Sequence, residues 1–151
     1  MKLRTVLTVL ACNVMAFVLM SFSAFLVIRF APWGRCPIDF MRLPPDQLMA
    51  RYGDPAKVLE SGVFYNDWVI APLIAFLVGA VAGAILRRSD WRVTTLSIPL
   101  LIMVFAIPVT LIRALAASLY IVASWSGMKW MSLWLGPSGS SPGRRSQTEG
   151  G

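Results

Sequence analysis

A stretch of 24 residues without a charged side chain, residues 5–28, most limits what this chain can fold into. About 20 apolar residues in a helix span the hydrocarbon core of a bilayer, and this stretch is longer than that. Lys2 and Arg4 precede it and Arg29 follows it, which is typical of a membrane helix. A cleaved signal peptide has a shorter apolar core, so we predict a retained first span at about residues 5–29.

The composition agrees with a surface that faces lipid. Charged residues make up only 14% of the chain, whereas soluble domains contain about 25%. A soluble fold of 151 residues with so few charges would expose a largely apolar surface. The formal net charge is +7, but the basic residues lie at the ends of apolar runs. We therefore predict the lipid bilayer as a partner, and no binding of nucleic acid.

Residues 30–67 form a polar segment that contains short helices. Pro45 is placed to open a helix that ends near Gly53, and Asp54 is placed to cap a second helix that ends at Gly62. We predict a structured extracytoplasmic loop. It carries four basic and five acidic side chains: Arg35, Arg42, Arg51, Lys57, Asp39, Asp46, Asp54, Glu60 and Asp67.

A second apolar run at residues 68–86 predicts another span. Ala75, Gly79 and Gly83 recur at intervals of four residues and therefore share one helix face. Small residues on one face let a second helix approach closely, so we predict helix packing there. The partner is either another helix of this chain or a second copy of it.

The last apolar stretch, residues 93–135, has two interpretations. The preferred one is a third span at about residues 97–125, followed by a tryptophan-rich segment at 126–135 that lies at the membrane interface. The alternative is a pair of spans that meet at Arg113. In both interpretations, residues 1–135 form a single membrane domain. Residues 136–151, rich in glycine and serine, form a disordered tail. The predicted class is an all-α integral membrane protein with three, or alternatively four, transmembrane helices.

Basic residues set the predicted orientation, because cytoplasmic segments are enriched in lysine and arginine. We expect the N-terminus in the cytoplasm, the loop at 30–67 outside, and the chain in a bacterial inner membrane. The four-span alternative moves Arg144 and Arg145 to the cytoplasmic side. The anchors used in this assignment are Lys2, Arg4, Arg87, Arg88 and Arg92.

Two polar residues fall at membrane depth. Arg113 is a candidate for an anion site or for a salt bridge to Asp67 or Glu60, although we favour a snorkelling side chain at a helix end. Asn13 can form hydrogen bonds between helices. Too few such residues exist to line a transport pathway.

No catalytic or metal-binding set stands out. The chain has no histidine, the commonest general base and metal ligand. Cys12 and Cys36 are expected at different depths, so no disulfide is predicted, and the sequence does not identify a cofactor. We therefore expect a non-enzymatic accessory or assembly subunit that binds other membrane subunits. The alternatives are a small oligomeric channel or transporter, and a membrane enzyme that uses loop carboxylates.

Overall fold

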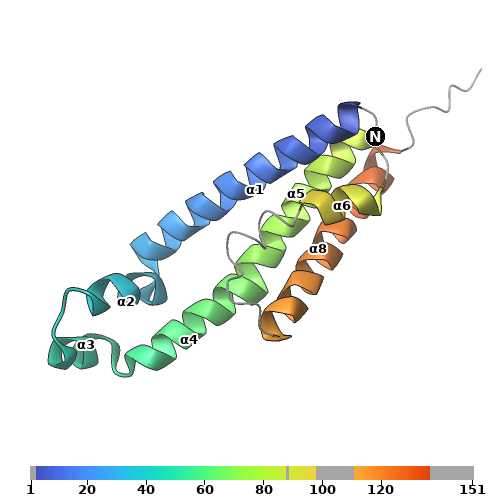
Figure 1. Ribbon diagram of the computed structural model, residues 1–151. Helices are drawn as coiled ribbons and strands as arrows, with labels where there is room; N and C mark the ends of the chain where they lie inside the picture. Colours follow the sequence, from blue (N-terminus) through green and yellow to red (C-terminus); the bar gives the residue numbers. More distant parts are fainter. Residues whose placement is uncertain (1–2, 88, 98–110, 137–151) are drawn as a thin grey trace, which may run out of the picture.

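The computed structural model describes residues 3–87, 89–97 and 111–136. All regular secondary structure in these residues is helical, which confirms the predicted all-α class. The elements are arranged as an elongated bundle with a small helical cap at one end (Figure 1). The helices are α1 (Leu3–Phe30), α2 (Pro32–Phe40), α3 (Pro45–Tyr52), α4 (Pro55–Tyr65), η1 (Asn66–Ile70), α5 (Ala71–Leu86), α6 (Trp91–Ser97) and α8 (Leu111–Leu135).

Helix α1 buries one narrow stripe of small or flexible side chains. The stripe repeats every three or four residues, as one face of an α-helix requires, and it packs on α5 and α6. It stops at Met20, so the last third of α1 has no fully buried residue. The buried residues are Thr5, Thr8, Cys12, Ala16 and Met20.

Helices α4, η1 and α5 form one continuous rod, Pro55–Leu86, that runs antiparallel to α1 (Figure 1). The prediction that Gly62 ends a helix was wrong. A glycine ends a helix when it adopts a left-handed conformation, but Gly62 remains helical. Its missing side chain instead makes room for Trp33, because a Cβ there would lie 2.9 Å from the Trp33 Cβ.

The cap consists of α2, α3 and the first turns of α4. Helix α3 has the predicted bounds, and Gly53 ends it with a φ of 72°. Asp54 caps α4, with its carboxylate accepting a hydrogen bond from the Ala56 amide at 3.1 Å. Helix α2 was not predicted, because the prolines and glycines of this stretch suggested breaks. Pro32 opens α2, and Gly34 lets it fold tightly against the Val27 carbonyl of α1.

The closest helix contact joins α5 to α8. A Cβ at Gly79 would overlap the Ser124 carbonyl, and a Cβ at Gly83 would lie 2.5 Å from the Met128 carbonyl oxygen. From α8, Gly127 fits against the Phe76 carbonyl in the same way. Both glycines of α5 meet residues that advance by four along α8, so the two helices run parallel, as Figure 1 also shows.

At the C-terminal end the described residues form one long helix, and the number of spans remains a prediction. Leu111–Leu135 is one helix, α8, so residues 126–135 continue the same helix as residues 111–125 instead of forming a separate segment. Residues 98–110 of the predicted third span, and the tail from 137 to 151, lie outside the described residues.

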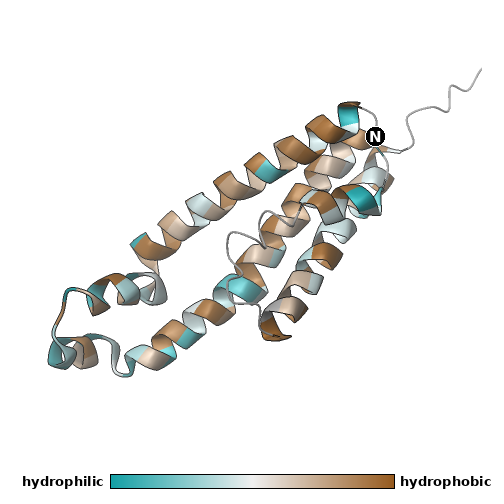
Figure 2. Cartoon of the chain, in the orientation of Figure 1, coloured by the Kyte–Doolittle hydropathy of each residue, from teal (hydrophilic) through white to brown (hydrophobic). Residues whose placement is uncertain are grey.

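Two helices in the described part of the chain are long and apolar enough to cross a membrane. They are α1 and the rod Pro55–Leu86, and apolar residues dominate both over most of their length (Figure 2). Their outward faces carry many exposed large apolar side chains, as expected for contact with lipid.

Candidate functional site

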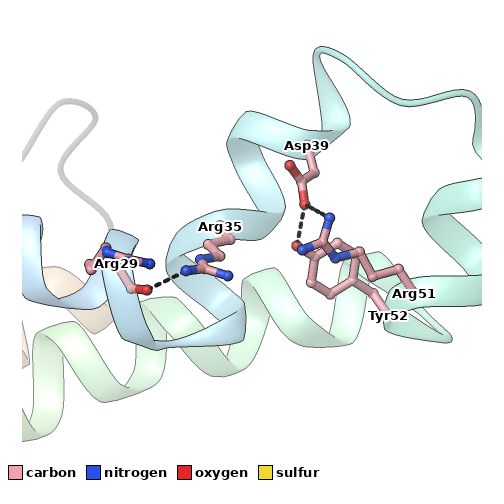
Figure 3. Close-up of polar contacts among 5 residues, drawn as sticks. All are labelled: Arg29, Arg35, Asp39, Arg51 and Tyr52. Atoms are coloured by element: carbon pink, nitrogen blue, oxygen red, sulfur yellow. Dashed lines mark hydrogen bonds and ion pairs between the residues drawn. The ribbon is translucent and has the colours of Figure 1, made fainter.

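Asp39 ties two helices of the cap together. Its carboxylate, 19% exposed, accepts a hydrogen bond from the Tyr52 hydroxyl at 2.6 Å and pairs with the Arg51 guanidinium at 3.0 Å (Figure 3). Both partners lie at the end of α3, whereas Asp39 lies at the end of α2. A charge-assisted pair of contacts to one carboxylate oxygen therefore fixes the angle between the two helices.

Burial in the cap keeps two titratable groups in their neutral forms. It raises the pKa of the Cys36 thiol, and the nearby Asp39 charge raises it further. Cys36 is fully buried, with its sulfur 3.9 Å from the Pro55 carbonyl oxygen, so it is neither nucleophilic nor accessible. Burial, followed by the hydrogen bond to Asp39, also raises the pKa of Tyr52, which remains a donor.

A small basic pocket of about 220 Å³ opens where α1 meets the cap. Its polar lining comes from Arg35 and Arg51. Arg35 is held in place because its guanidinium donates a hydrogen bond to the Arg29 carbonyl at 2.6 Å (Figure 3). The remaining lining residues are Phe30, Ala31, Pro32 and Tyr52. We call this the arginine pocket.

A larger apolar groove of about 420 Å³ lies between α1, the rod and helix α2 of the cap. Its lining includes Ala24, Val27 and Val63, and Asn66 and Asp67 lie on one wall. The Asn66 amide donates a hydrogen bond to the Asp67 carboxylate at 3.0 Å. Both belong to η1, a π-helical turn, and such turns are frequent at functional sites. We call this the side groove.

Three of the five loop carboxylates are engaged in separate local interactions. Asp39 binds α3, Asp54 caps α4 and lies 3.8 Å from the Lys57 ammonium, and Asp67 binds Asn66. In the described residues no three histidine, cysteine or acidic side chains gather as a metal site.

The predicted intramembrane residues have different positions. The Asn13 amide donates hydrogen bonds to the carbonyl oxygens of Val9, at 2.8 Å, and of Leu96 in α6, at 3.4 Å, and so connects two helices. Arg113 lies in the first turn of α8, but its side chain is outside the described part.

Three of the predicted topology anchors, Arg4, Arg87 and Arg92, lie near one end of the bundle (Figure 1). The Arg4 guanidinium donates a hydrogen bond to the Ile85 carbonyl at 2.5 Å, which joins the start of α1 to the end of α5. Arg87 follows α5 directly, and the Arg92 guanidinium lies 6.0 Å from the Trp91 ring centre in α6. Lys2 and Arg88 are outside the described residues.

Comparison with family models, with curated proteins and with solved structures gave no match to this chain.

Replacing Asp39 with alanine is expected to loosen the cap. Arg51 and Tyr52 would both lose their partner, and hydrogen bonds to a charged group contribute about 2 kcal/mol. Cys36 is buried near this contact, so a maleimide reaches its thiol only when the cap opens. In a Cys12→Ala background, Asp39→Ala should therefore label at Cys36 roughly 30-fold faster than the chain with Asp39 intact. Asp46→Ala, at an exposed position of α3, is the matched control. Equal labelling rates in Asp39→Ala and Asp46→Ala would contradict the role of Asp39 in holding the cap together.

Proposed function

We propose that this chain is a four-span, non-enzymatic accessory or assembly subunit of a larger membrane complex, and that the side groove receives an apolar helix of a partner subunit. The observation that carries the proposal is the side groove itself, an apolar hollow with an amide and a carboxylate on one wall.

The parallel arrangement of α5 and α8 supports four crossings over three. The end of α5 and the end of α8 lie at the same end of the bundle as the start of α1 (Figure 1). The chain therefore has to return between Leu86 and Leu111. Four crossings place Arg4, Arg87 and the basic tail on one side, which is the cytoplasmic side by the positive-inside rule, and the cap on the extracytoplasmic side of a bacterial inner membrane.

The position of the side groove favours a protein partner. Beyond Met20, α1 buries no residue fully within the bundle, and Ala24 and Val27 of this part line the side groove. Acyl chains can cover such a surface, but they offer no hydrogen-bond partner to Asn66 and Asp67. A helix with one polar side chain can pack against the apolar walls and also form a hydrogen bond with Asn66 or Asp67.

Photocrosslinking in native membranes tests the proposal. A benzoylphenylalanine at Val63, which lines the side groove and is 56% exposed, is expected to give a discrete adduct with one other membrane protein. Val69, 49% exposed on the same rod but outside the groove, is the matched control. A discrete adduct from Val63 but not from Val69 supports the proposal. Adducts with lipid alone, or only with a second copy of this chain, would overturn it, and the second result would favour an oligomeric channel.

A further inference from the structure

We propose that the arginine pocket binds the phosphate of an anionic phospholipid. This inference rests on the membrane placement in the proposed function, but it does not depend on a partner subunit. Arg35 and Arg51 would hold the phosphate, and the end of α1 would contact the glycerol and the first acyl carbons.

The charge of the pocket favours an anion. Arg35 and Arg51 line it, and none of its six lining residues is acidic. The nearby carboxylate of Asp39 takes one donor of Arg51, at 3.0 Å, whereas a guanidinium has five N–H donors. The Arg51 side chain remains 51% exposed, so the other donors can reach a ligand. The planar donor arrangement of guanidinium matches phosphate oxygens in a bidentate manner.

The position of the pocket favours a lipid over a soluble anion. It begins at Phe30, the last residue of α1, directly after the apolar run that ends before Arg29. Phe30, Ala31 and Pro32 supply apolar walls, which a free phosphate would not use. An amphiphile at the membrane interface presents its phosphate and its first acyl carbons together, and guanidinium groups bind phosphate oxygens on either side of a membrane.

The preorganisation of the two arginines strengthens this assignment. The Arg29 carbonyl holds Arg35 at 2.6 Å, and Asp39 holds Arg51, so both guanidinium groups are oriented before a ligand arrives (Figure 3). Oriented donors lose less side-chain entropy on binding than free ones.

Native mass spectrometry of the purified full chain in detergent tests this inference. With added phosphatidylglycerol we expect a one-lipid adduct that exceeds the phosphatidylcholine adduct by about tenfold. Arg35→Gln should reduce that preference to near one while the Asp39 contacts of the cap remain, because these contacts come from Arg51 and Tyr52. Arg42→Gln, which removes an exposed arginine of the cap outside the pocket, should leave the preference unchanged.

Three results would overturn the inference: equal adducts with both lipids, an anionic preference that survives Arg35→Gln, or full competition by inorganic phosphate, which would indicate a site for a soluble anion. Arg35→Lys separates geometry from charge, and a partial loss is expected because the ammonium cannot bind phosphate in a bidentate manner. The measurement uses the isolated chain. A failed crosslink at Val63 and a failed lipid preference are therefore distinguishable results.

Discussion

Replacing Gly79 with leucine is expected to separate α5 from α8 and to destabilise the bundle by about 3 kcal/mol or more. Even a Cβ at this position would overlap the Ser124 carbonyl, and a backbone carbonyl in a helix has no room to move aside. Gly79→Ala should therefore have an intermediate effect. Thermal unfolding in detergent, followed by the loss of the monodisperse species in size-exclusion chromatography, measures both changes.

Val81→Phe is the matched control for Gly79→Leu. Val81 lies on the same helix but is exposed, so added bulk there should leave the melting temperature nearly unchanged. If Gly79→Leu converted a dimer into a stable monomer with an unaltered melting temperature, the glycine face would join two copies of the chain, and the contact with α8 would not be the stabilising one.

A cysteine in the tail is expected to be inaccessible from outside the cell. In the proposed four-span topology, Ser140→Cys reacts with an impermeant maleimide only after the membrane is permeabilised. Met41→Cys, in the cap at a position 87% exposed, reacts in intact cells or spheroplasts. Cys12 and Cys36 are both buried, so background labelling should be low.

Labelling of Ser140→Cys from outside, at the rate seen for Met41→Cys, would contradict four crossings and would restore the three-span interpretation. Equal labelling of the two variants after permeabilisation is the necessary control, because it shows that both cysteines are chemically reactive.

Local patterns in the sequence predicted the local structure well. The apolar run before Arg29 predicted a long helix, and α1 extends over Leu3–Phe30. Pro45 and Gly53 gave the bounds of α3, because each has a fixed backbone preference. Gly62 misled the prediction, since its role is to accommodate Trp33 and not to break the helix.

The contacts between distant segments were not predictable from local patterns. The spacing of Gly79 and Gly83 indicated a packing face, but it did not identify the partner. Gly127 was the missed signal, because it lies four residues after Ala123 on α8 and so forms a second small-residue pair. The partners of Asp39 are 12 and 13 residues away in the sequence, on another helix, and no periodicity connects them.

The π-helical turn at Asn66–Ile70 has a consequence for how this chain can change over time. Such a turn accommodates one additional residue in an otherwise α-helical rod without rotating the segments on either side of it. Insertion or deletion of one residue elsewhere in the rod would turn one side against the other by about 100°. Loss of a single residue from η1 would instead return the rod to a plain α-helix, so this turn is a place where the chain can change length by one codon while the cap and the contacts between α5 and α8 keep their positions.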